Sequence, residues 1–151
     1  SLSTNLIRAD ITTHAGDQAR FIEGSGVSFL VSLNQRAYVL LMLENESNLR
    51  TQLYPAQSMP DLRQDAGDYL PLTNFSTTLR VSPPFGRETV TMLASDRPFP
   101  PLPLVSNGAL RTLSWSNEQW GSWLQAYPKQ CGCQFTIDQV SFTTFADDGK
   151  L

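Results

Sequence analysis

The chain has 151 residues, which is long enough to bury one hydrophobic core, and we expect a single domain over residues 1–151. Hydrophobic residues make up 40% of the chain and charged residues 17%, a balance that argues against disorder. The net charge is -3 and the 11 lysines and arginines are scattered, so no nucleic-acid partner is expected. No stretch approaches the roughly 20 apolar residues of a transmembrane helix, so the chain is not expected to be membrane-spanning.

The first long pattern is an alternation of apolar and polar residues over residues 27–33. It predicts a strand with one buried face, formed by Val27, Phe29, Val31 and Leu33. Gly24 and Gly26 precede this strand and predict a tight turn after residues 21–22. At its other end, residues 34–35 predict a hairpin into the next strand.

The next strand, residues 37–43, is apolar on both faces, so we expect other elements to cover each side of it. A polar turn leads to an alternating strand over residues 49–54. Pro55 ends that strand, because proline cannot donate to a β-ladder. Residues 55–76 contain closely spaced prolines and glycine and are expected to be mostly loop.

A second hairpin is predicted from residues 77–81 to residues 89–94, with Pro83-Pro84-Phe85-Gly86 at its corner. Short strands separated by turn residues at this spacing favour a β-sandwich or barrel. The proline-rich residues 98–103 predict a stiff, extended connector. Their P-x-x-P spacing also fits docking on an aromatic groove of another protein, which is the less favoured interpretation.

One helix is predicted from Ser116, because Ser116 and Gln119 have the spacing of a capping box. Aromatic and apolar residues then follow at helical spacing, namely Trp120, Trp123, Leu124 and Tyr127. We expect this stripe to pack on the second apolar face of the sheet; the alternative is a stacking platform for sugars or bases. Pro128 is expected to end the helix. A last strand over residues 133–145 changes its apolar phase near Asp138 and Gln139, which predicts a β-bulge there.

Candidate reactive residues are few. His14 is the only histidine, and it lies in a polar turn without a nucleophile elbow to partner it. Cys131 and Cys133 allow a soft-metal site, a small disulfide, a pair of free thiols or a bond to another chain. We expect no catalytic residue, no metal and no cofactor, and keep a metal or redox site at the Cys-Gly-Cys as an alternative.

An ordered series of short motifs runs from Gly24 to Pro98. It comprises Gly24 before the strand 27–33, Tyr38-Val39-Leu40-Leu41, Leu53-Tyr54-Pro55, Ala66-Gly67 with Leu70-Pro71, Pro83-Pro84-Phe85-Gly86 with Glu88, and Ala94-Ser95-Asp96-Arg97-Pro98. This series resembles the bacterial family called domain of unknown function 4384. The resemblance covers residues 21–98 and leaves a C-terminal extension with the helix and last strand, residues 104–146, outside it.

The resemblance implies a mainly β fold: an immunoglobulin-like antiparallel β-sandwich, here with one C-terminal helix and a final strand. Such domains are appended to bacterial envelope proteins, lipoproteins, protein kinases and caspase-like proteins. It therefore implies a non-catalytic accessory module that contacts a protein partner or other domains of its own chain. We expect it in the periplasm or cell envelope, and the alternative is a cytoplasmic accessory domain of a kinase.

The expected interaction surface comprises unpaired strand edges and the residues Tyr54, Pro55, Pro83, Pro84, Phe85 and Trp115. The alternative function is a small-ligand or glycan-binding domain that uses exposed aromatic side chains. Its candidate residues are Trp115, Trp120 and Trp123.

Overall fold

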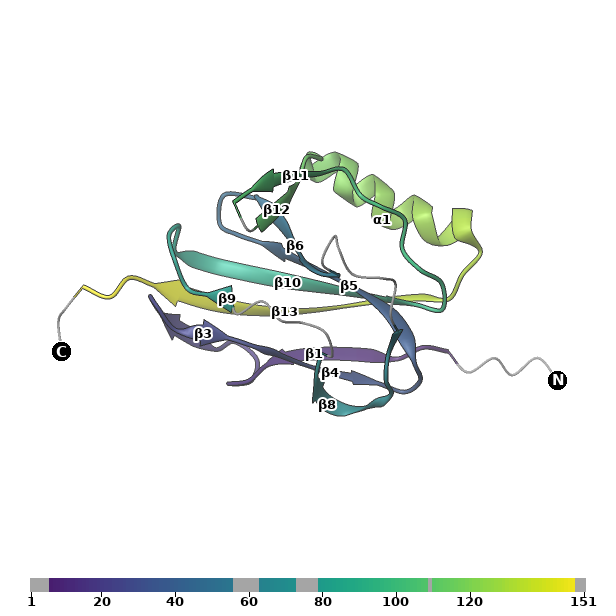
Figure 1. The fold of residues 1–151 in the computed structure, drawn as a ribbon, viewed down its shortest axis with the longest axis horizontal. Coiled ribbons are helices and arrows are strands. Elements are labelled where there is room, and N and C mark those ends of the chain that lie inside the picture. Colours follow the sequence, from purple (N-terminus) through teal and green to yellow (C-terminus); the bar gives the residue numbers. More distant parts are fainter. Residues whose placement is uncertain (1–5, 56–62, 73–78, 109, 149–151) are drawn as a thin grey trace.

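The computed structural model describes residues 6–55, 63–72, 79–108 and 110–148 (Figure 1). Strands dominate these residues, and one helix lies near the C-terminus. In chain order the elements are β1 (Ala9–Thr13), β2 (Arg20–Ile22), β3 (Gly26–Val27), β4 (Phe29–Leu33), β5 (Ala37–Glu44), β6 (Arg50–Tyr54), β7 (Arg63–Gln64), β8 (Gly67–Pro71), β9 (Leu79–Arg80), β10 (Gly86–Ser95), β11 (Leu104–Asn107), β12 (Leu110–Leu113), α1 (Asn117–Cys131) and β13 (Phe135–Phe145).

Two main sheets stack on each other. The smaller has the order β1-β4-β8, and the larger has the order β11-β12-β6-β5-β10-β13-β2, with β7 also paired to β5. The short strands β3 and β9 pair with each other, and β2 runs parallel to its partner, β13. The predicted mainly β sandwich with one C-terminal helix and a final strand is confirmed. Among the described residues, no helix is both long and apolar enough to cross a membrane.

The main hydrophobic core lies between these two sheets. Its buried members include Phe29, Val31 and Leu33 of β4, Val39 and Leu41 of β5, and Val90 and Met92 of β10. The alternation predicted for residues 27–33 is confirmed, although Ser28 divides the segment into β3 and β4. The inward residues of the smaller sheet therefore close one face of the larger one.

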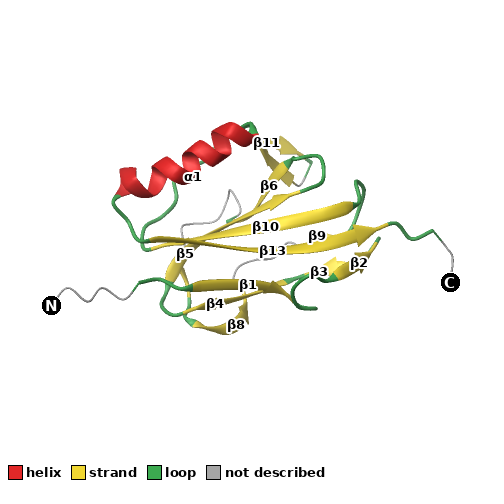
Figure 2. Cartoon of the chain, turned by 180° about the vertical axis from the view of Figure 1, so that it is seen from behind, coloured by secondary structure: helices red, strands yellow, loops and turns green. Residues whose placement is uncertain are grey.

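The opposite face of the larger sheet is covered by α1, as Figure 2 shows. Leu40 and Met42 of β5 and Leu93 of β10 point to this side, where they form a second buried cluster with Leu113 and Trp120. The prediction that β5 is covered on both faces is confirmed. The predicted packing of the aromatic helix stripe on the second sheet face is confirmed as well.

The start of α1 follows the sequence prediction, but its end does not. Gln119 N–H donates to Ser116 Oγ at 3.1 Å and Ser116 N–H donates to Gln119 Oε1 at 2.8 Å, which completes the capping box. The expected stop at Pro128 is wrong, because the helix continues to Cys131. A proline near the C-terminus removes one hydrogen bond of the last turns, whereas Gly132, with φ 60°, adopts the left-handed conformation that ends the helix.

Both predicted hairpins are wrong, although their turn residues do turn the chain. β4 pairs with β1 and β8, whereas β5 belongs to the larger sheet, so residues 34–35 connect two sheets. Likewise β9 pairs with β3, and the Pro83-Pro84 corner leads into β10 of the larger sheet. The apolar pattern explains why β4 belongs to a different sheet from β5 and β10. β4 has one buried face, whereas β5 and β10 carry apolar residues on both faces and need a layer on each side.

β13 pairs with β10 in one unbroken register, from Thr144 opposite Gly86 to Phe135 opposite Ser95. The β-bulge expected near Asp138 is therefore wrong. Phe135 packs toward the helix layer, whereas Val140 and Phe142 lie in the sandwich core, so the apolar phase changes because a different layer covers each end. Residues 98–103 form the expected connector without regular structure, and the hairpin of β11 and β12 after them was not predicted.

Asp138 of β13 joins the two sheets. Its Oδ2 accepts a hydrogen bond of 2.8 Å from the Ile11 N–H of β1. Burial raises the pKa of Asp138 above its ordinary value and a hydrogen bond with Asp10 raises it further, while the N–H groups of Ile11 and Gln139 oppose these effects. The folded protein therefore binds this proton more tightly than the unfolded chain does.

The segment that resembles the family, residues 21–98, does not contain β1 or β13. We predict that a fragment of residues 21–98 does not unfold cooperatively, because β13 lies between β10 and β2 and β1 pairs with β4. Thermal denaturation followed by circular dichroism tests this, with residues 6–148 as the control fragment. A cooperative transition and a dispersed amide NMR spectrum from residues 21–98 would contradict the prediction.

Substitution Asp138→Asn should keep the hydrogen bond from Ile11 and remove the titration. Because the pKa of Asp138 is higher in the folded protein than in the unfolded chain, its contribution to stability is present at acid pH and is lost as pH rises through the folded pKa. The variant should therefore be at least as stable as the wild type at neutral pH, and this advantage should disappear in acid. Urea unfolding across the pH range measures the free energies of unfolding of the variant and the wild type. A variant that is less stable than the wild type at neutral pH would contradict the prediction.

Candidate functional site

One hollow with mixed apolar and polar walls lies at the end of the sandwich where β10 begins and β13 ends. It is a cavity of about 410 Å³. Its apolar walls come from both the larger sheet and the β3–β9 pair, through Val27, Leu43, Leu53, Leu79, Val81 and Phe142. Volumes of this order and mostly apolar walls are typical of sites that bind a small molecule or a partner's side chains.

One carboxyl group lines this cavity. Glu88 alternates along β10 with Val90 and Met92, so it occupies the same inward row as these core residues. Burial raises the pKa of Glu88, and a hydrogen bond with the Thr144 side chain acts in the opposite direction. In the described parts of the chain, no lysine or arginine forms an ion pair with Glu88. The cavity thus combines a mostly apolar lining with one carboxyl group that forms no ion pair with a cation of the described residues.

The mouth of the cavity carries exposed apolar residues. Leu49 and Leu110 line it although 43% of each residue's surface is exposed. Pro83 and Pro84 line it too, so this part of the predicted interaction surface lies at the site. Arg80 also lines it, and its guanidinium donates to the Gly24 carbonyl at 3.2 Å.

The Pro-Pro-Phe-Gly corner brings a second acidic side chain close to this region. Gly86 has φ 143°, a conformation that other residues rarely adopt, and a Cβ there would lie 2.9 Å from Cγ of Glu46. Glycine at this position therefore allows Glu46 to lie against the start of β10, two residues before Glu88.

The other predicted surface residues lie elsewhere. Tyr54 is 1% exposed and belongs to the core, where its hydroxyl accepts a hydrogen bond of 2.9 Å from Gln64, so its assignment to an interaction surface is wrong. The carbonyl of Pro55 accepts hydrogen bonds from Gln52 and Arg111. Phe85 packs partly against the core.

The tryptophans form a packed cluster rather than an open platform. Trp120 is buried, and Trp115 and Trp123 are half-buried, with ring centroids 5.9 Å apart. Trp123 also stacks on Trp120 and Tyr127, at 5.6 and 5.0 Å. These rings fill the space between α1 and the sheet, so they offer little free surface for a glycan.

His14 has a structural environment. Its Nδ1 accepts the N–H of Ser28 at 3.2 Å, and its ring lies against Phe21 with centroids 5.3 Å apart. These contacts fix the turn between β1 and β2 against the start of β4. Nothing in this arrangement presents His14 as a general base to a nucleophile.

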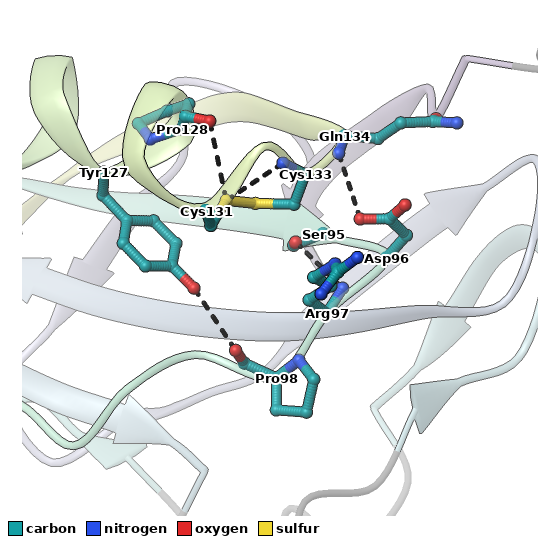
Figure 3. Close-up of a disulfide and its surroundings, with 9 residues drawn as sticks. All are labelled: Ser95, Asp96, Arg97, Pro98, Tyr127, Pro128, Cys131, Cys133 and Gln134. Carbon is teal, nitrogen blue, oxygen red and sulfur yellow. Dashed lines mark hydrogen bonds between the residues drawn. A yellow bond between two sulfur atoms is a disulfide. The ribbon is translucent and has the colours of Figure 1, made fainter.

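Cys131 and Cys133 form a disulfide at the C-terminal end of α1, as Figure 3 shows. The Cys133 N–H lies 3.2 Å from Cys131 Sγ, and the Gln134 N–H donates to Asp96 Oδ1 at 3.0 Å. Of the interpretations left open by the sequence, the structure contains the disulfide. Within the described residues, no group of three or more His, Cys, Asp and Glu side chains is placed to hold a metal ion.

The position of this disulfide does not favour redox catalysis. Cys131 is the last residue of α1, where the negative end of the helix dipole disfavours a thiolate. Reactive cysteines gain nucleophilicity from the opposite environment, a helix N-terminus or a nearby cation. The geometry therefore gives the pair a local structural role at the helix end.

Sequence reasoning did not identify the cavity as a site. Glu88 entered only as part of a family motif, and Leu49 and Leu110 were not singled out. A signal for Glu88 was present, because a charged residue stands in the apolar phase of a strand that reads Glu88, Val90, Met92. The contribution of Leu110 had no such signal, since it depends on how the hairpin of β11 and β12 folds back on β6.

The fold and the site define a small β-sandwich domain with a helix layer on one side and a ligand-sized cavity at one end. A family model described as Domain of unknown function (DUF4384) matches residues 20–98, and the chain belongs to this family, as its motifs indicated. The matched segment includes every cavity-lining residue except Leu110 and Phe142. Neither a curated protein nor a solved structure matches the chain.

The disulfide closes a loop of only three residues, so it constrains the unfolded chain little. We predict that the double substitution Cys131→Ser and Cys133→Ser lowers the free energy of unfolding by about 2 kcal/mol or less. Urea denaturation measures this, and the wild type in excess dithiothreitol is the control that should match the variant. Failure of the variant to fold would show that the disulfide has a larger role.

Proposed function

We propose that the domain is a non-catalytic interaction module of a larger bacterial envelope or signalling protein. In this proposal, a segment of a protein partner, or of another domain of its own chain, inserts side chains into the cavity beside Glu88. The observation that carries it is the open cavity of about 410 Å³ with Leu49 and Leu110 exposed at its mouth. Exposed apolar residues around a hollow are characteristic of binding sites, because they cost free energy unless a partner covers them.

Two further observations support an interaction module over the alternatives. His14 and the disulfide have structural environments, and neither lines the cavity. The tryptophans expected for glycan binding pack between α1 and the sheet. The cavity, in contrast, is built mainly from the segment shared with the family.

The proposal includes the periplasm or cell envelope as the compartment. The disulfide between Cys131 and Cys133 supports it, because disulfides persist in oxidising compartments and are rare in the cytosol. A cytoplasmic accessory domain of a kinase is the alternative, and it requires the two cysteines to be reduced in the cell.

A peptide-phage selection on the folded chain tests the proposed binding site. We expect selected peptides to lose at least about tenfold in affinity for the double variant Leu49→Asn and Leu110→Asn, because a bound peptide would then cover two polar amide groups in place of two apolar side chains. The matched control is Val105→Asn, which alters a residue of β11 that is 58% exposed but does not line the cavity.

Fluorescence polarisation with labelled peptides measures these affinities, and thermal melts verify that each variant is folded. Equal binding of all selected peptides to the wild type and the double variant would reject the cavity as the contact site.

A further inference from the structure

Glu88 gives the cavity a chemical preference. Its side chain occupies the inward row of β10, next to Val90 and opposite Phe142 in the β10–β13 register. A carboxylate held in such apolar surroundings costs free energy unless a cation or several hydrogen-bond donors satisfy it. Among the described residues, the Thr144 hydroxyl forms a side-chain hydrogen bond with it. A cationic group that enters the cavity would supply the missing charge.

The residues that line the cavity indicate what kind of group would carry that positive charge. The lining that surrounds the Glu88 carboxyl is mostly apolar, with Leu43, Leu53 and Leu79 among its members, and its polar side chains include Asn45, Thr51 and Ser82. A small hydrated cation would gain nothing from these walls. Lysine and arginine side chains have an apolar stem that ends in a charged head, so they match a mostly apolar hollow whose lining includes a carboxyl group.

The charges around the cavity agree with this preference. Among the described residues, Arg80 is the one cationic residue that lines it, and its guanidinium is bound to the Gly24 carbonyl. Arg87 precedes Glu88 in β10 and therefore points to the opposite face of the strand. Glu46 lies beside Gly86, and Glu44 forms an ion pair with Arg50. No cation of the described chain thus competes for the Glu88 carboxyl.

We infer that the cavity binds a lysine or arginine side chain of the protein partner, with its aliphatic stem along the leucine walls and its cationic head on Glu88. This inference rests on the proposed function, because it assigns the chemistry of the side chain that the cavity receives. It makes Glu88 a specificity-determining residue and separates it from the leucines at the mouth, which contact any apolar group.

The probes are three capped tripeptides that differ at one position: acetyl-Ala-Lys-Ala-amide, acetyl-Ala-Arg-Ala-amide and the neutral acetyl-Ala-norleucine-Ala-amide. Titrations of the whole chain, followed by ¹⁵N-¹H NMR, should show saturable shifts of the amides of Val27, Val81 and Glu88 with a cationic peptide. Norleucine has nearly the same stem as lysine but no charge, so its affinity should be at least about tenfold lower.

The variant Glu88→Gln keeps the size of the side chain and removes its charge. It should bind the lysine and norleucine peptides equally, whereas the control Glu118→Gln removes the same charge from the exposed first turn of α1 and should retain the preference. If Glu88→Gln does not fold, the wild type still gives an answer. Lowering the pH through the pKa of Glu88, which burial raises, should weaken binding of the cationic peptides and leave the norleucine peptide unchanged.

Equal affinity of the wild type for the norleucine and cationic peptides would overturn the inference, and so would the absence of saturable shifts with either cation. These results leave the proposed function standing if phage-selected peptides still depend on Leu49 and Leu110. Loss of that dependence would instead reject the proposed function itself, so the two failures are distinguishable.

Discussion

The structure depends on one constraint, which is that the central strands of the larger sheet are apolar on both faces. Leu41 of β5 points into the sandwich, while its neighbours Leu40 and Met42 point to the opposite side. Each fully buried side chain of this size contributes roughly 2 kcal/mol of hydrophobic free energy, so neither face can be left to water. The smaller sheet covers one face and the aromatic side of α1, centred on Trp120, covers the other. The C-terminal region is therefore part of the same packed unit as the segment that defines the family.

The same arrangement explains why a cavity forms at one end. β10 has 10 residues and β13 has 11, whereas β1 and β4 in the covering sheet have five each. The smaller sheet cannot cover the full length of the long strands. At the end of β10 that lies beyond β1 and β4, the described covering strands are β3 and β9, which pair over two residues each. The cavity lies there, beside Glu88 and Phe142. Among the described residues, the cavity therefore coincides with the end at which the covering strands are short.

Two carboxyl groups lie on the inner face of the larger sheet, and their positions give them different surroundings. Asp138 lies where β1 passes over β13, and the Ile11 N–H satisfies it. Glu88 lies beside the cavity, near the end of the smaller sheet, and no backbone N–H of the described residues that cover it donates to its carboxyl group. Burial raises the pKa of both groups, yet only Glu88 faces a space that a ligand could occupy.

Structural features that depend on neighbouring residues could be predicted from the sequence. The capping box of Ser116 and Gln119, the alternation over residues 27–33 and the two-sided burial of residues 37–43 were all predicted, since side-chain period and helix capping act within a few residues. The sheet to which each strand belongs could not be predicted, because a turn such as residues 34–35 reverses the chain equally well within a sheet or between two sheets. The change of apolar phase along β13 was wrongly interpreted as a β-bulge for a related reason. Periodicity shows which residues are buried but not which layer covers them. Only the tertiary structure decided that Glu88, Leu49 and Leu110 meet at one cavity, because that meeting depends on strand lengths and sheet order, which are set by contacts between residues far apart in the chain.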